Sequence, residues 1–212
     1  QETSFSQIAA DALGLRIEDV VVLRGDTATA THGRDTYGSR ATAVGGPAIL
    51  MCTDKLIAKG RVLAAQLLKG KASAVRFKAG RFILKGKSLG WKELAREAYE
   101  AKRIPAGFEP GLEASSFFEP PSCTYPFGTH LASVEVDRDT GAIKIHSFTA
   151  VDDCGPRLNP LLVEGQVQGG IAQGLGQALF ERTVYGDDGQ LLTGEFMDYP
   201  LPRAADMPEL TL

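Results

Sequence analysis

The sequence predicts an α+β fold in which mixed sheets and β-hairpins are combined with long helices. Apolar residues recur at helical spacing over residues 46–68 and 161–181, and alternating strands flank a turn at residues 139–141. With 212 residues, 43% of them hydrophobic, the chain can bury a sizeable core. We expect one domain, or two subdomains at about residues 1–110 and 111–212.

Two helices and a strand are expected in the first third of the chain. An apolar pattern with helical spacing begins near Phe5 and is closed by Gly14. The apolar run at residues 20–23 is typical of a short buried strand. A polar loop and a series of small residues, 41–48, then lead into the second helix, expected over about residues 46–68.

A hairpin, a third helix and a further strand should follow. Short strands at residues 74–78 and 81–84 flank a two-residue turn. A helix is expected at about residues 88–102, with Ser88 as its N-cap. Residues 112–118 are a predicted strand, which two consecutive prolines would end.

The clearest hairpin lies in the second half of the chain. Residues 129–137 and 143–152 alternate in polarity around the turn and are expected to pair. Asn159 introduces a helix over about residues 161–181. A second tight turn is expected at residues 187–189.

Composition excludes several classes of protein. The net charge of −3 and the isoelectric point near 5.7 give no electrostatic reason to expect nucleic acid as a partner. No apolar run approaches the roughly 18 residues that span a bilayer, so we expect no membrane span and a cytoplasmic location. The three cysteines include no Cys-x-x-Cys pair, which predicts free, mostly buried thiols. The three histidines are isolated, and we expect solvated or otherwise satisfied rings at His32, His130 and His146.

The segment at residues 165–177 is unusual because it places five glycines in a helical pattern. Each glycine costs about 1 kcal/mol relative to alanine, so a compensating interaction is expected. One explanation is close packing against another helix, without any ligand. The other is close approach of the backbone to a bound group, with Gln166 and Gln173, on one face, supplying amide donors and acceptors. Spacing alone leaves both open.

Residues 35–42 have the composition of an anion site. Small and hydroxyl-bearing side chains precede Gly45, Gly46 and a helix start, where backbone N–H groups favour phosphate or another oxyanion. No Gly-Lys-Ser/Thr follows, so the segment is not a P-loop, and no Gly-x-Gly-x-x-Gly follows a strand. A plain loop-to-helix junction explains the pattern equally well.

Five segments, taken together, resemble successive blocks of one protein family. They are QETSFSQIAADALGL, VVLRGDTATATHGRDTYGSRATAVGG, ASVEVDRDTGAIKIHSFTAVDDCGPRLNP, VEGQVQGGIAQGLGQALFE and DYPLPRAADMPEL. In this order they are similar to the molybdopterin-binding large subunit of the xanthine dehydrogenase and aldehyde oxidase family, in the style of carbon monoxide dehydrogenase. The resemblance implies that residues 1–212 are a partial molybdopterin-binding domain.

The same resemblance implies a molybdenum-dependent oxidoreductase that hydroxylates an aldehyde, an N-heterocycle or a similar small substrate, with water as oxygen donor. The implied cofactor is molybdopterin, as such or in its cytosine dinucleotide form. FAD and 2Fe-2S clusters on partner chains or domains would carry the electrons away. The implied partners are the remaining segments of the large subunit and the iron–sulfur and FAD subunits, within a dimer of the full complex.

Motif matching places three groups of residues at the cofactor. The pterin would be contacted by Gln1, Glu2 and Thr3. Backbone and hydroxyl groups beside molybdenum would come from Arg40, Ala41 and Thr42. The cofactor would also be bound by Gly38 and Ser39. The pterin and phosphate end would be bound by Gln166 and Gln173.

Two features depart from the family pattern. The family's catalytic glutamate is expected in a glycine-rich segment beyond Leu212, so we predict no catalytic residue and no metal ligand here, and no activity of this chain alone. Asp35 stands where the family has glycine before Thr36. The alternative, from a different class, is a non-catalytic binding or assembly module that retains the scaffold.

Overall fold

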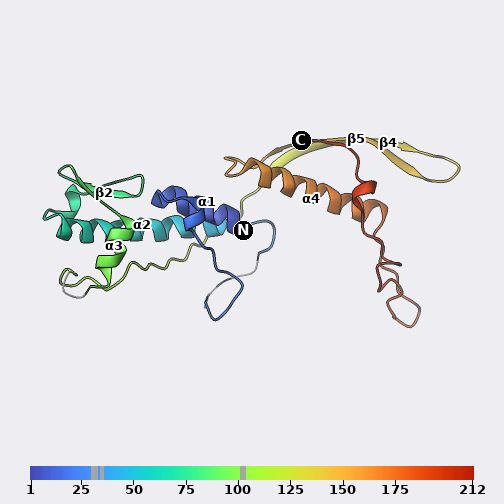
Figure 1. The fold of residues 1–212 in the computed structure, drawn as a ribbon. Coiled ribbons are helices and arrows are strands. Elements are labelled where there is room, and N and C mark those ends of the chain that lie inside the picture. Colours follow the sequence, from blue (N-terminus) through green and yellow to red (C-terminus); the bar gives the residue numbers. More distant parts are fainter. Residues whose placement is uncertain (30–32, 34–35, 101–103) are drawn as a thin grey trace. The chain divides into compact units, whose positions relative to one another are not determined.

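Figure 1 shows a computed structural model, which describes residues 1–29, 33, 36–100 and 104–212. Within these residues the chain forms four α-helices and two three-stranded sheets, which confirms the α+β class. There are two compact units, residues 1–123 and 124–212. The expected subdomains stay a prediction, because compactness alone does not show that a segment folds independently.

Helices α1 (Glu2–Leu13) and α2 (Ala41–Leu67) lie side by side in the first unit (Figure 1). As expected, α1 ends at Gly14, whose left-handed backbone (φ 61°) suits glycine. A Cβ atom on Gly45 of α2 would lie 2.5 Å from the ring of Phe5, so the missing side chain permits the close approach of the two helices.

The start of α2 differs from the prediction. The helix begins at Ala41 rather than near residue 46, and Pro47 lies inside it. Glycine and proline lower the intrinsic helix propensity of this turn, but packing against α1 compensates for it. Local propensity is therefore a poor guide to where this helix begins.

The core of the first unit lies between α2, a small antiparallel sheet and α3 (Trp91–Ala98). The sheet has the order β1 (Arg76–Lys78), β2 (Arg81–Leu84) and β3 (Lys87–Gly90). The largest fully buried side chains are those of Phe82, Leu63 and Leu94. Phe82 meets Trp91 edge to face, with 4.9 Å between the ring centroids. This unit is therefore built on a conventional hydrophobic core.

Two predicted strands are absent from the described residues. Residues 20–23 follow the 3₁₀ turn η1 (Ile17–Asp19) without forming a strand, and Val21 is 80% exposed. Residues 112–118 also form no strand. Both predictions were wrong for the same reason: an apolar run becomes a strand only where a neighbouring strand pairs with its backbone.

The third helix was predicted too early. Ser88 lies in β3, opposite Ile83, and is not the N-cap of a helix. Gly90 takes that position instead, and its backbone N–H donates to Glu93 Oε2 at 2.6 Å. The helix ends at Ala98, and Tyr99, within the predicted range, is 62% exposed. The last two residues of the predicted helix, 101 and 102, lie outside the described residues.

The second unit contains the predicted hairpin of β4 (Phe127–Val136) and β5 (Ile143–Asp153). Asp137 Oδ1 accepts hydrogen bonds from the backbone N–H groups of Asp139 and Thr140, both at 2.9 Å, which fixes the turn. The two-residue strand β6 (Leu210–Thr211) pairs with β5 in parallel.

Helix α4 (Pro160–Leu179) confirms the helix that was predicted at about residues 161–181. Asn159 Oδ1 accepts from the N–H of Leu162 at 3.3 Å, a side-chain N-cap. In residues 124–212 the buried apolar side chains are those of Ala150 and Ile171. The second unit therefore has secondary structure but almost no hydrophobic core of its own.

The remaining elements are short. A tight turn at residues 187–189 is closed by an isolated pairing of Tyr185 with Leu191, as predicted. Two further 3₁₀ turns are η2 (Ala72–Ala74) and η4 (Ala204–Asp206). No helix among the described residues is long and apolar enough to cross a membrane.

Candidate functional site

A sharp turn sets the start of α2. Gly38 and Ser39 both have left-handed backbones, with φ of 57° and 53°. Glycine adopts this conformation at no steric cost, whereas Ser39 is held in a less favourable one. Arg40 is the N-cap residue and makes no side-chain capping hydrogen bond. The first backbone N–H groups of the helix, at residues 41–43, lack intrahelical partners, as at any helix start.

Arg40 is held beside this helix start by Tyr37. Its guanidinium carbon lies 4.7 Å from the centroid of the Tyr37 ring, and Nη1 donates to the tyrosine hydroxyl. The side chain of Arg40 is half-buried. These contacts fix the cation at the end of α2 whose helix dipole is positive, so both features favour a negatively charged group.

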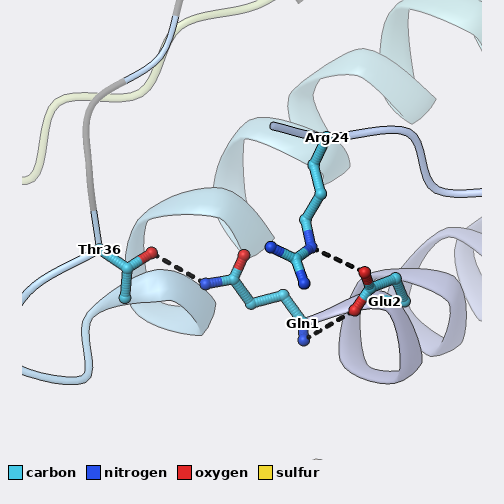
Figure 2. A network of polar contacts seen from close by, with 4 residues as sticks. All are labelled: Gln1, Glu2, Arg24 and Thr36. Carbon is cyan, nitrogen blue, oxygen red and sulfur yellow. Dashed lines mark hydrogen bonds and ion pairs between the residues drawn. The ribbon is translucent and has the colours of Figure 1, made fainter. Parts of the chain in front are cut away.

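The first residues of α1 lie close to the same loop (Figure 2). Gln1 Nε2 donates to Thr36 Oγ1 at 2.8 Å, which joins the start of the chain to the segment before α2. Arg24 Nε donates to Glu2 Oε1, also at 2.8 Å. This bond is the main reason why the pKa of Glu2 is lowered from 4.5 to about 2.

A cavity of about 460 Å³ opens at this place, a volume typical of small-molecule sites. Of the predicted site residues, the wall contains Gln1, Arg40 and Ala41. Five others of the first unit are exposed but do not line the wall: Glu2, Thr3, Gly38, Ser39 and Thr42. The rest of the wall consists of Phe5, Gly33, Thr36, Val44, Gly45, Phe117, Phe118, Glu119 and Pro120.

The sequence interpretation missed the wall formed by residues 117–120. The two phenylalanines were predicted as the end of a strand, although the prolines that follow lack the backbone N–H that strand pairing needs. The usable signal was the combination of adjacent aromatic residues, a carboxylate and prolines in a segment without a pairing partner.

In the second unit, Gln166 and Gln173 are exposed on α4. Helical spacing places them on the face opposite the buried Ile171, among the glycines. A Cβ atom built on any of four glycines would meet nothing within 4 Å: Gly165, Gly169, Gly170 and Gly174. These four glycines pack against nothing within the described chain, so packing inside this chain does not explain their cost.

The other candidate groups form no centre of their own. His130 Nε2 lies 3.1 Å from Asp152 Oδ2, and His146 Nε2 lies 2.8 Å from Glu135 Oε2, in exposed pairs on the hairpin. His32 and Asp35 lie outside the described residues. No group of three or more potential metal ligands occurs in the part of the chain that the structure describes.

The cysteines correct one expectation. All three are free, as predicted, but Cys123 and Cys154 are exposed and Cys52 is only partly buried. The expectation of mostly buried thiols was wrong, because two of them lie in loops that no core covers.

A family model described as the molybdopterin cofactor-binding domain matches residues 1–208. The chain belongs to this family. It is 42% identical over 208 residues to the carbon monoxide dehydrogenase large chain of Hydrogenophaga pseudoflava, a match that covers 98% of this chain and 26% of that protein.

Two solved structures related to this molybdopterin cofactor-binding domain agree with its fold. Reconstituted CO dehydrogenase from Oligotropha carboxidovorans aligns with a TM-score of 0.87 at 38% identity, over 99% of this chain and 26% of the other. Quinoline 2-oxidoreductase from Pseudomonas putida 86 aligns with a TM-score of 0.85, also at 38% identity, over 99% and 27%. The chain therefore spans about a quarter of the length of the relatives it matches.

Proposed function

We propose that this chain forms part of the cofactor cradle of a molybdenum-dependent hydroxylase. The observation that supports the proposal most strongly is the cavity at the start of α2, whose wall contains Gln1, Arg40 and Ala41, the first residue of the helix. The residues present fit a molybdopterin group. The cation and the helix start suit a negatively charged group of the cofactor, and the amide of Gln1 suits a polar ring.

The open glycines of α4 support the same assignment. Without side chains at these positions, a bound group can approach the backbone closely, and the amides of Gln166 and Gln173 can donate and accept hydrogen bonds on that face. We propose that they bind the pterin and phosphate end of the cofactor, as molybdopterin or its cytosine dinucleotide form.

In the whole enzyme, the bound cofactor would supply the oxidation of an aldehyde, an N-heterocycle or a similar small substrate, with water as the oxygen donor. The residues of this chain bind and orient it: Arg40 neutralises charge, and Gln1 and Thr36 hold the loop beside α1. We assign the catalytic base to none of residues 1–212. FAD and 2Fe-2S clusters would lie on partner chains or domains of a dimeric complex in the cytoplasm.

The exposed apolar surface of the second unit supports further segments of the large subunit as partners. Leu131 of β4 is 69% exposed, Leu161 of α4 74% and Phe196 79%. Exposed side chains of this size in a unit almost without a core are typical of a surface that another part of a protein covers.

The test is cofactor content. The chain is co-expressed with the remaining large-subunit segments, and molybdenum and oxidised pterin are measured in the purified complex. We expect near-stoichiometric molybdenum, reduced about tenfold by Arg40→Ala because a cation that faces a negatively charged group of the cofactor is lost.

The matched control is Arg16→Ala. Arg16 is exposed, pairs with Asp19 and does not line the cavity, so its removal should leave the molybdenum content unchanged. If no cofactor is found although all segments are present, the proposal is wrong, and a non-catalytic assembly module becomes the better assignment.

A further inference from the structure

The cavity wall formed by Phe117, Phe118, Glu119 and Pro120 has a polarity that Arg40 and the start of α2 do not explain. Arg40 and the start of α2 favour an acceptor or an anion, whereas a carboxylate repels an anion. We infer that this segment recognises the amino group of a planar heterocycle through Glu119, an inference that rests on the proposed cofactor site.

Glu119 is available for this role. It is exposed and makes no hydrogen bond or ion pair with any residue that the structure describes. Arg40 lines the same cavity, but its side chain is engaged by Tyr37 and not by Glu119. Because these two opposite charges share a cavity but do not pair with each other, each can contact a different edge of the same ligand.

An ionised carboxylate only accepts hydrogen bonds. The ligand must therefore turn N–H donors towards Glu119 and carbonyl or phosphate acceptors towards the start of α2. An amino-substituted pyrimidine ring meets both demands, since its amino group donates and its ring carbonyl accepts. Such a ring occurs in a pterin and in cytosine, and the experiment below distinguishes the two.

The aromatic side chains of the cavity suit the faces of such a ring. Phe117 is 75% exposed and Phe118 half-buried, so both keep apolar surface for a planar group. Phe5 contributes a third ring, and its position is fixed by the close packing on Gly45. Stacking of the ligand on these phenylalanine rings does not depend on the ligand's amino group, whereas the contact with Glu119 does.

The test compares ligands in which oxygen replaces the exocyclic amino group, a change that also places a proton on a neighbouring ring nitrogen. Binding to the purified chain is measured by calorimetry for CMP against UMP, and for pterin-6-carboxylate against lumazine-6-carboxylate, which carries oxygen in place of the amino group. We expect the amino member of at least one pair to bind about tenfold more tightly, and the pair that shows the preference identifies the ring.

Glu119→Gln should abolish this preference, because the amide also donates and no longer favours a donor. The control Glu113→Gln changes an exposed glutamate of the same segment that does not line this cavity, and should preserve the preference. Phe118→Ala should weaken the amino and oxo ligands alike.

Equal binding of both members in both pairs, no binding of any probe, or a preference that survives Glu119→Gln would overturn the inference. None of these results contradicts the proposed function, which the measurement of cofactor content tests separately. A Glu119→Gln complex that still loads molybdenum but shows no change in preference contradicts the inference alone.

Discussion

At the scale of single residues, the start of the chain is organised by paired charges rather than by burial. Glu2 is exposed, yet Arg24 binds its carboxylate from 22 positions further along the chain. This ion pair ties α1 to the loop that follows η1, and the bond from Gln1 to Thr36 ties it to the segment before α2. The second of these contacts joins two residues of the cavity wall beside the helix that carries Phe5.

The Glu2 contact predicts a measurable titration. Because the folded pKa of about 2 lies below the ordinary 4.5, the contact stabilises the fold above pH 4.5, and this contribution is lost as the pH falls towards 2. Arg24→Gln should raise the pKa of Glu2 towards 4.5, which NMR titration of its side-chain carboxyl resonance measures.

Arg16→Gln is the matched control, since Arg16 is also exposed but binds Asp19 at 2.8 Å. It should leave the titration of Glu2 unchanged and raise the lowered pKa of Asp19. An unchanged Glu2 titration in Arg24→Gln would show that Arg24 is not the main cause of the low pKa.

At the scale of elements, glycines in the two long helices have opposite surroundings. A Cβ atom on Gly60 of α2 would lie 2.3 Å from the ring of Phe82, at the centre of the core. A Cβ atom on Gly169 of α4 would meet nothing within 4 Å. The first glycine is therefore explained by packing within the chain, and the second is not.

These surroundings predict opposite effects of one substitution. Gly60→Ala should destabilise the chain by about 1–3 kcal/mol through overpacking, partly offset by the better helix propensity of alanine. Gly169→Ala should not destabilise it, because about 1 kcal/mol of propensity is gained without a clash. Urea denaturation followed by circular dichroism measures the effect of Gly60→Ala, and the far-ultraviolet helix signal measures that of Gly169→Ala. A stabilised Gly60→Ala would contradict the geometry of the core.

Elements whose signal is local could be predicted from the sequence, and those that depend on a partner could not. The turn at Asp137, the cap at Asn159 and the stop at Gly14 rest on side-chain and backbone chemistry within a few residues. The residue at which α2 begins depends on packing against α1. Whether residues 112–118 form a strand depends on whether another strand lies beside them.

The candidate site divides in the same way. Gln1 and Arg40 were expected at the cofactor from motif matching to the family, and the structure brings both to the wall of one cavity. Glu119 was missed, because only the tertiary structure brings residues 117–120 to the start of α2. A single sequence holds no local signal for such an approach between distant segments.

At the scale of the whole molecule, the two units differ in how far each buries its own apolar residues. The first contains a buried cluster around Leu63, Phe82 and Leu94. The second, residues 124–212, buries Ala150 and Ile171 while Leu131 and Phe196 stay exposed. Burial of apolar surface is the main favourable term in folding, so the second unit lacks most of what would make it a cooperative domain.

We therefore expect the two units to behave differently when produced separately. Residues 1–123 should unfold cooperatively in urea, with a Leu94→Ala variant destabilised by about 2–5 kcal/mol. Residues 124–212 should bind the dye ANS, keep far-ultraviolet circular dichroism and lack a sharp transition, as expected for secondary structure without specific packing. Adding the remaining large-subunit segments should suppress the dye signal, because they would cover the exposed strands and α4. A sharp, dye-free transition of the isolated second unit would show that its open surface needs no partner, and would remove the support that this surface gives to assembly with other segments.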